Sequence, residues 1–186
     1  MDRKRLLELI RERAYEKKKV VLSSGRESDF YVDCRQVTLN SEGAYLVGSA
    51  IYDLLNSKGE KVEAAGGLTL GADPIVTSVA VISHIRGNPI QSFIIRKEAK
   101  KHGMGAWIEG RRNLTEGMKV AILEDVVTTG ASTLKAIERA RSIGLDVRRV
   151  ICLVDRNEGG ADAIRESGFN LEAIFLREEI EGKEKP

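Results

Sequence analysis

The sequence predicts an α/β fold in which a mostly parallel central sheet is flanked by helices, and three observations support this prediction. Apolar runs alternate with helical patterns from residue 62 onward, as in parallel strands joined by crossover helices. Several of these runs are apolar throughout, which is typical of strands buried on both faces. At 186 residues with 42% apolar side chains, the chain has the size of one domain with one core.

The order of the elements follows from periodicity. Stretches in which apolar residues return every three or four positions predict helices. These span 6–14, 44–55, 74–85, 132–143 and 161–167. Short apolar runs bounded by glycine, asparagine or charged residues predict strands, the first two of them as a small hairpin. These span 20–22, 30–32, 62–67, 92–95, 119–123, 147–154 and 171–176. The polar residues after 176 are expected to fray.

Composition and charge exclude several classes of partner. The 30 basic and 28 acidic residues leave a net charge of +2, which favours neither nucleic acid nor an anionic membrane. No run is long enough to span a bilayer, and the N-terminus lacks the apolar stretch of a signal peptide. We therefore expect a cytoplasmic protein without nucleic-acid or membrane partners. Cys34 and Cys152 are too far apart for a CxxC motif and are expected to be small packed thiols.

Residues 120–133 read VAILEDVVTTGAST and form the most informative motif. An apolar strand runs into an acidic pair and then into a turn that opens a helix. The turn offers consecutive backbone N–H groups, two threonine hydroxyls, a glycine able to take a positive φ and a helix N-terminus, which together make a phosphate cradle. Ligands of open parallel sheets lie at such carboxyl ends of strands. The motif is neither a P-loop nor a dinucleotide fingerprint, because GxxxxGKS/T and GxGxxG are both missing.

The acidic pair, Glu124 and Asp125, comes immediately before this cradle. Two carboxylates would repel a phosphate, so they are expected to address vicinal ribose hydroxyls or positive charge that develops on a sugar ring. A phosphorylated ribose satisfies both halves of the motif. The alternative is an acidic or hydroxyl cap that merely starts a helix.

This unit resembles the signature of the type I phosphoribosyltransferases, whose fold combines a mostly parallel sheet with a small hood from both chain ends. The resemblance implies a single domain over 1–186, with 1–40 contributing to the hood. It implies that Glu124 and Asp125 contact the ribose hydroxyls of phosphoribosyl pyrophosphate (PRPP), with Asp125 also catalytic. The loop that would hold the 5′-phosphate comprises Val126, Val127, Thr128, Thr129, Gly130, Ala131 and Ser132.

A second segment, RKEAKKHG at 96–103, resembles the RKExKxHG stretch of the orotate phosphoribosyltransferases. The pyrophosphate ligands implied by this match are Arg96, Lys97, Lys100 and His102. Lys100 and His102 are also implied in catalysis, because a leaving group with several negative charges calls for preorganised cations. The charged, Gly-rich stretch 97–116 is too long for an ordinary connection and is expected to be a flexible catalytic lid loop. A solvated basic surface is the alternative.

Two further segments resemble the orotate-binding parts of that family. SSGRESDFY at 23–31 is similar to the hairpin that packs an aromatic residue near the base, and DRNEGG at 155–160 is similar to DRxEGG. The orotate contacts implied are Tyr31, Val32, Thr128 and Arg156. A guanidinium suits the carboxylate of orotate because it binds two oxygens at once. The alternatives are an ordinary exposed hairpin and a surface pair of Asp155 with Arg156.

The chain departs from the family pattern at two positions. Ser23 and Leu70 stand where the bacterial pattern often has lysine, so contacts made by those two side chains are not transferred. Leu70 belongs to the Gly-rich segment 66–74, which occupies the place of the family's pyrophosphate loop. Asp73 in that segment is expected to be a helix cap before Pro74 rather than a metal-associated acid.

Together these segments imply an orotate phosphoribosyltransferase of de novo pyrimidine (UMP) biosynthesis. Such an enzyme uses Mg²⁺ to transfer phosphoribose from PRPP to orotate, giving orotidine 5′-monophosphate and pyrophosphate. The Mg²⁺ is expected to be held through PRPP and water near Asp125, without a direct protein ligand. The family further implies a homodimer whose lid loop is shared between subunits. The alternatives are a transferase for a purine or another base, and a PRPP-sensing regulator without catalysis.

Overall fold

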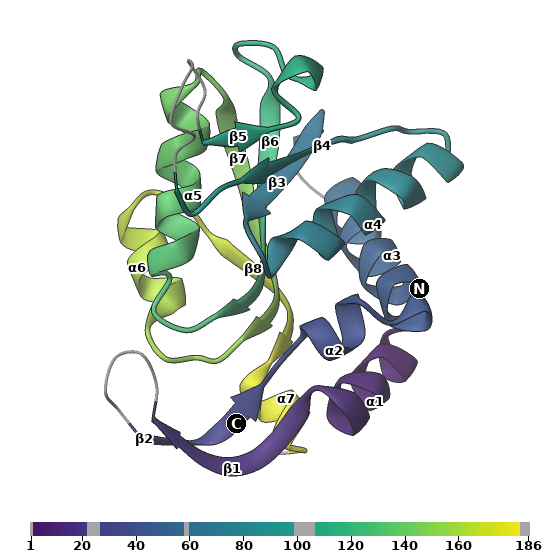
Figure 1. Ribbon diagram of the computed structural model, residues 1–186, viewed down its shortest axis with the longest axis vertical. Helices are drawn as coiled ribbons and strands as arrows, with labels where there is room; N and C mark the ends of the chain where they lie inside the picture. The colour runs from purple at the N-terminus through teal and green to yellow at the C-terminus, as the bar shows by residue number, and fades with distance from the viewer. Residues whose placement is uncertain (1, 22–26, 58–59, 99–106, 183–186) are drawn as a thin grey trace.

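A six-stranded sheet forms the centre of the molecule in the computed structural model, which describes residues 2–21, 27–57, 60–98 and 107–182 (Figure 1). The strands lie in the order β5-β4-β3-β6-β7-β8. Their bounds are Ala64–Leu68 for β3, Gln91–Ile95 for β4, Ile108–Glu109 for β5, Lys119–Val127 for β6, Asp146–Asp155 for β7 and Leu171–Leu176 for β8. Neighbouring strands are parallel except β5, which pairs antiparallel with β4. The predicted mostly parallel sheet is confirmed.

Helices cover both faces of this sheet (Figure 1). One face carries α3 (Ser41–Ser57) and α4 (Ala72–Ile85), and the other carries α5 (Ala131–Ser142) and α6 (Gly160–Glu166). The core divides into two buried clusters because successive side chains of a strand point to opposite faces. In β6, Ile122 joins the cluster beneath α5, whereas Leu123 joins the cluster beneath α3 and α4. The middle parts of the two central strands, 120–123 in β6 and 150–154 in β7, are therefore apolar at every position.

Both ends of the chain build the hood beside the carboxyl ends of the strands (Figure 1). Its elements are α1 (Arg3–Arg13), β1 (Tyr15–Val21), β2 (Glu27–Val32), α2 (Arg35–Thr38) and α7 (Arg177–Glu181). The strands β1 and β2 form the predicted antiparallel hairpin. The first of them begins at Tyr15, earlier than predicted, because Lys17 pairs with Phe30 across the hairpin despite its polar side chain.

The short helix α7 corrects the expectation that the chain frays after residue 176. Ile180 is buried in the core cluster beneath the hood. Arg11 of α1 donates from Nε to the Ile180 carbonyl oxygen at 3.0 Å, and Arg3 pairs with Glu179 at 2.7 Å. Arginine donors at carbonyls near a helix C-terminus stabilise that end. Contacts with the N-terminal helix thus order a segment that is polar in sequence.

The long connection after β4 contains structure that was not predicted. Its last part holds β5 and a 3-10 turn, η1 (Arg111–Asn113), which both lie against β4. Residues 99–106 of the expected lid lie outside the described residues. The helix α2 was also not predicted, because four residues are too few for a periodic pattern. Within the described ranges, no helix has the length and apolar character needed to cross a lipid bilayer.

Candidate active site

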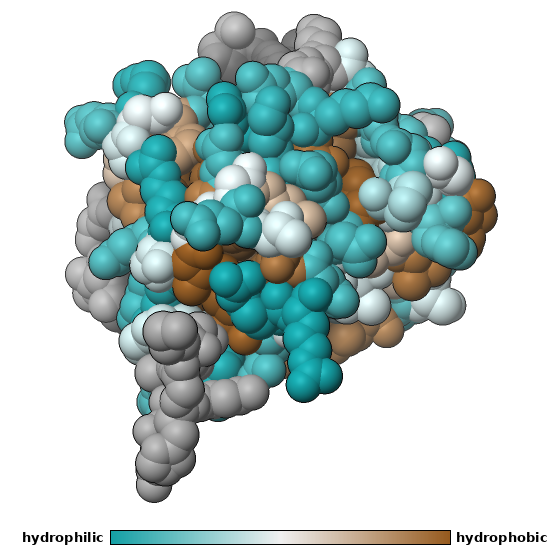
Figure 2. Space-filling view, turned by 90° about the horizontal axis from the view of Figure 1, so that it is seen from above, coloured by the Kyte–Doolittle hydropathy of each residue, from teal (hydrophilic) through white to brown (hydrophobic). Residues whose placement is uncertain are grey.

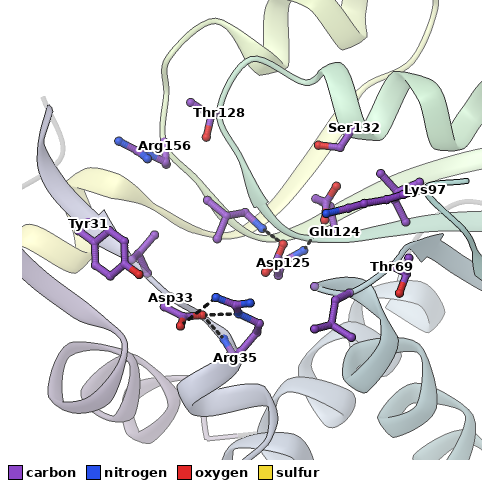
Figure 3. A pocket seen from close by; sticks show the side chains of 15 residues that line it. Tyr31, Asp33, Arg35, Thr69, Lys97, Glu124, Asp125, Thr128, Ser132 and Arg156 are labelled. Atoms are coloured by element: carbon purple, nitrogen blue, oxygen red, sulfur yellow. Dashed lines mark hydrogen bonds and ion pairs between the residues drawn. The ribbon is translucent and has the colours of Figure 1, made fainter. Parts of the chain in front are cut away.

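A cavity of about 390 Å³ opens at the carboxyl ends of the central strands (Figure 3). Its walls come from five places in the chain: the end of β2, the residues leading to α2, the loop after β3, the end of β6 with the turn that follows it, and the loop after β7. The turn at 126–132, which was predicted to hold a phosphate, is called the phosphate turn below. Lys97, just beyond β4, closes one side. Most of the described residues that the motifs singled out therefore meet in one cavity, as expected for an open parallel sheet.

The acidic pair forms the middle of this cavity (Figure 3). Strand β6 continues to Val127, past the predicted end at 123, so Glu124 and Asp125 are held by the pairing with β7. The Asp125 N–H donates to Glu124 Oε1 at 3.2 Å, and the Val126 N–H donates to Asp125 Oδ1 at 2.8 Å. Burial raises the pKa of Glu124 well above its usual range, and the charge of Asp125 raises it further. Keeping two carboxylates side by side, one of them buried, therefore has an electrostatic cost.

The phosphate turn connects β6 to α5. Gly130 precedes the helix with a φ of 79°, a conformation that favours glycine. Three residues of the predicted phosphate loop line the cavity: Val126, Thr128 and Ser132. Val127 is buried in the core, and the structure does not bring Thr129, Gly130 or Ala131 to the cavity wall. A role for these four residues in holding a phosphate stays a prediction.

The turn is packed against the loop that follows β7. A side chain at Gly130 would lie 3.0 Å from the Gly160 carbonyl oxygen, and one at Gly160 would lie 2.7 Å from the Thr128 carbonyl oxygen. The second contact is closer than real Cβ atoms come to an oxygen, and the first is tighter than most, so glycine at each position lets the two loops approach. The Arg156 N–H also donates to the Val127 carbonyl oxygen at 3.0 Å. The phosphate turn and the DRNEGG loop are therefore packed and hydrogen-bonded together.

One end of the cavity carries Tyr31, Thr128 and Arg156 (Figure 3), and Val32, the neighbour of Tyr31 in the chain, also lines the cavity. These are the four residues predicted to contact a base. Arg156 is buried and donates from Nη2 to the Phe30 carbonyl oxygen at 3.1 Å. It also pairs with Glu158 at 2.8 Å. The alternative surface pair of Asp155 with Arg156 is wrong, because both side chains are buried and Asp155 accepts from the Asn157 N–H at 2.9 Å.

The opposite end of the cavity carries Lys97, Thr69 and Ser132 (Figure 3). Arg96, the other described residue of the basic segment, does not line the cavity and pairs instead with Glu109 at 3.0 Å. Lys100 and His102 lie outside the described residues, as does Ser23. Leu70 lines the cavity with its apolar side chain more than half exposed. Among the described residues of the basic segment, Lys97 is therefore the one that brings a positive charge to this end of the cavity.

The loop after β3 lies directly against the acidic pair. A Cβ at Gly71 would overlap the Asp125 carboxylate, so only glycine allows the approach. The peptide bond between Thr69 and Leu70 is cis. The expectation that Asp73 caps α4 is wrong, because Gly71 occupies the N-cap position. The Asp73 carboxylate instead accepts a hydrogen bond from the Thr69 hydroxyl at 2.7 Å. The Asp73 carboxylate therefore ties the loop to the helix.

Two polar residues of the cavity wall, Asp33 and Arg35, were missed by the sequence reasoning. Arg35 Nε lies 2.8 Å from Asp33 Oδ1, and hydrogen bonds from Arg35 hold the pKa of Asp33 below its usual range. Their position in the sequence could have identified them, because they follow closely after Tyr31 and Val32 at the end of β2. Residues so near to a predicted site residue are candidates for the same cavity wall.

The oxygen donors in the middle of the cavity and at its Lys97 end suit a hard cation. Carboxylate oxygens of Glu124 and Asp125 and the hydroxyls of Thr69 and Ser132 are oxygen donors of the kind that Mg²⁺ prefers. Within the described part of the chain there is no group of three or more His, Cys, Asp and Glu side chains that could hold a metal by itself. A cation here would therefore share its coordination with a ligand or with water.

Comparison with known proteins gives a consistent result. No protein-family model matches the chain. An orotate phosphoribosyltransferase of Sorangium cellulosum is 50% identical over 179 residues, which cover 96% of this chain and 93% of that protein. The crystal structure of Mycobacterium tuberculosis H37Rv orotate phosphoribosyltransferase in complex with Fe(III) dicitrate aligns with a TM-score of 0.83 at 38% identity, covering 97% and 99% of the two chains. The structure of that enzyme in complex with PRPP aligns with a TM-score of 0.79 at 35% identity, covering 97% and 99%.

Proposed function

This chain belongs to the orotate phosphoribosyltransferase family, and from this premise we propose that its cavity transfers phosphoribose from PRPP to N1 of orotate. The products are orotidine 5′-monophosphate and pyrophosphate, in a step of pyrimidine biosynthesis. The observation that carries the proposal is the order of groups along the cavity. Arg156 and Tyr31 lie at one end, the acidic pair in the middle, and Lys97 with Thr69 at the other end (Figure 3). A base, a ribose and a pyrophosphate require that order.

The ribose part of the reaction falls to Glu124 and Asp125. As the bond from C1 to pyrophosphate breaks, positive charge develops on the sugar ring, and carboxylates fixed nearby stabilise it more than they stabilise the ground state. Because Glu124 is buried, its interaction with that charge is weakly screened. The main chain of the phosphate turn holds the 5′-phosphate and so fixes the ring above the two acids.

The leaving pyrophosphate is assigned to the end with Lys97. An ammonium group there stabilises the negative charge that accumulates as the bond breaks. Lys100 and His102 are proposed to contribute further positive charge at this end, because their segment resembles the pyrophosphate-binding stretch of the family. Arg96 is a weaker candidate than the motif implied, because its guanidinium is paired with Glu109.

Orotate is assigned to the end with Arg156. The guanidinium pairs with the carboxylate of orotate, which is the feature that a neutral purine lacks. This favours orotate over the purine alternative. A PRPP-sensing regulator would have no need of a buried arginine at the base end, so this arginine favours an enzyme.

Mg²⁺ is proposed to bind together with PRPP at the oxygen donors in the middle of the cavity. When bound, it would supply positive charge that offsets the negative charge of the pyrophosphate. Asp125, which reaches the cavity from the end of β6, is the candidate carboxylate near it, with water between them. The cytoplasmic location expected from the sequence stays a prediction.

A homodimer is proposed from the family and is supported by an apolar surface beside the cavity. Five large hydrophobic side chains are more than half exposed among the described residues, and they come from the end of α2, from α3 and α4, and from the loop before α4: Leu39, Tyr45, Leu70, Val81 and Ile85. Figure 2 shows brown surface at its right margin, the side on which α3 and α4 lie in Figure 1. An apolar face of this kind suits contact with a second copy.

Subunit exchange tests the proposed sharing of the lid. Inactive Lys100→Ala and Asp125→Asn proteins are mixed and allowed to exchange. If the lid of one subunit serves its partner, mixed dimers hold one intact site and activity returns to about a quarter of the wild-type value. If each lid serves its own subunit, the mixture stays inactive. Sedimentation of wild-type protein, with Val81→Glu as the interface variant and Lys135→Glu as the control, tests the dimer itself.

The activity itself is tested by the ultraviolet absorbance of orotate. Purified protein with orotate, PRPP and Mg²⁺ is expected to consume orotate, whereas Asp125→Asn is expected to be slower by orders of magnitude. Turnover of adenine, hypoxanthine or uracil without turnover of orotate would contradict the assigned base. Binding of PRPP without turnover of any base would favour the regulator.

A further inference from the structure

Arg139 is a buried cation on α5, the helix that begins at the phosphate turn. Its exposed fraction is only 7%, whereas Arg141, two residues further along the same helix, is exposed. Burying a guanidinium is costly unless its donors find acceptors. The position of Arg139 therefore requires a structural or functional reason.

The partners of Arg139 lie at the ends of two paired strands, directly after β4 and directly before β5. Its Nη1 donates to the Arg96 carbonyl oxygen, and its Nη2 donates to the Lys97 carbonyl oxygen at 3.2 Å. Its guanidinium carbon lies 3.6 Å from the centroid of the Trp107 ring. The Arg96 N–H in turn donates to the Trp107 carbonyl oxygen at 2.8 Å. One side chain thus holds the backbone after β4 and the aromatic residue that faces it.

Lys97 is the residue whose backbone this contact holds and whose side chain lines the cavity. Its side chain enters the cavity between Ser132 and Thr69, at the end opposite to Tyr31 and Arg156, and its nitrogen points toward Glu124 (Figure 3). Because the carbonyls of Arg96 and Lys97 are both bonded to Arg139, the direction in which the Lys97 side chain leaves the backbone is constrained. A flexible lysine gains precision only from such support.

We propose that Arg139 is a positioning residue for the pyrophosphate end of the cavity, acting through the backbone of Lys97. This inference rests on the proposed function. Since α5 begins at the turn that holds the 5′-phosphate, the same helix sets the spacing between the two phosphate-binding parts. Arginine is required because only a planar fork bonds two carbonyls at once while stacking on an indole ring.

The test compares Arg139→Lys with Arg141→Lys, a matched control on the same helix. Arg141 also stacks on an aromatic ring, with its guanidinium carbon 4.9 Å from the centroid of Phe169, but it has no contact with β4 among the described interactions. Binding of inorganic pyrophosphate is measured by calorimetry, and the KM values for PRPP and orotate are measured by turnover. In Arg139→Lys we expect pyrophosphate binding to weaken and the KM for PRPP to rise, each about tenfold. The KM for orotate and all constants of Arg141→Lys stay within about twofold.

The outcomes separate the inference from the proposed function. Unchanged pyrophosphate binding in Arg139→Lys, with wild-type turnover of orotate intact, overturns the inference alone. Failure of the wild-type protein to bind pyrophosphate or to turn over orotate overturns both. Equal losses for orotate and PRPP would mean a merely structural role and contradict the inference. If Arg139→Lys does not fold, Trp107→Leu removes the stacking surface while leaving the guanidinium, and the same selective loss for PRPP and pyrophosphate is expected.

Discussion

The Glu158 carboxylate lies 2.8 Å from the Arg156 guanidinium at the base end of the cavity. Both side chains are largely buried, and Glu158 also lies 3.5 Å from Arg177 of α7. The guanidinia of Arg156 and Arg177 stand 5.4 and 5.0 Å from the centroid of the Phe30 ring. Glu158 therefore fixes the orientation of Arg156 and offsets part of its charge, so that an incoming carboxylate meets a preorganised fork.

The first prediction concerns Arg156. Arg156→Lys is expected to raise the KM for orotate about tenfold to a hundredfold, because lysine keeps the charge but loses the fork that bonds a carboxylate. The KM for PRPP is expected to change little. Initial rates at varied orotate and PRPP concentrations measure both values. Arg165→Lys, an exposed arginine on α6 paired with Asp162, is the control and should behave as wild type. A larger effect on PRPP than on orotate would contradict the assignment.

The second prediction concerns Gly71. Gly71→Ala is expected to lower kcat/KM at least about tenfold, because the added methyl group overlaps the Asp125 carboxylate and must displace it. Gly117→Ala is the control. Gly117 lies at the other end of β6, and its φ of 77° means that alanine strains the backbone there. The added methyl group would meet no atom within 4 Å. This variant should lose stability but keep kcat/KM. Thermal unfolding and steady-state rates separate the two effects; equal kinetic losses would remove Gly71 from the site.

The third prediction concerns the stability cost of Glu124. Burial raises its pKa in the folded protein, so the unfolded chain ionises first as the pH rises. Folding stability from this group is present below the ordinary carboxyl pKa and is lost as the pH rises through the raised pKa. Glu124→Gln carries no such loss. Its Tm without PRPP should therefore exceed that of wild type by a few degrees at about pH 8, and the difference should shrink toward pH 4.

The same substitution should lower activity. The ribose hydroxyls lose a charged acceptor, which corresponds to a fall in kcat/KM of about tenfold to a hundredfold. A variant that is more stable above neutral pH and less active would fit a site that holds two carboxylates together for function. A Tm difference that is the same at both pH values would contradict the raised pKa.

The fourth prediction concerns the cysteines. Cys34 and Cys152 are both free and buried, as the sequence suggested, and burial raises the pKa of both thiols well above the usual range. Neither should react rapidly with an aromatic disulfide reagent in the native protein, because the thiolate is the reactive form. Two thiols per chain should react at once after denaturation. Fast reaction of one native thiol would show that its surroundings open readily.

The main elements of the fold were predictable because their signals are local. Apolar runs and helical spacing located the central strands and the long helices to within a few residues. The phosphate turn and the acidic pair were visible for the same reason, since strand, carboxylates and glycine are consecutive in the chain. The elements that were missed, α2, α7 and β5, are short and owe their order to distant contacts. The Ile180 carbonyl of α7, for instance, is bonded by Arg11 from the other end of the chain.

The sequence by itself determined the α/β class, the place of the phosphate turn and the family that the chain resembles, because these depend on residues that are neighbours in the chain. Only the tertiary structure decided which side chains share the cavity. Arg35 lines it although no motif named that residue, whereas Arg96 is paired with Glu109 outside it. It also decided that Arg139 bonds the backbone at Lys97. Such partners are far apart in sequence, and their meeting depends on strand order and burial, which periodicity does not encode.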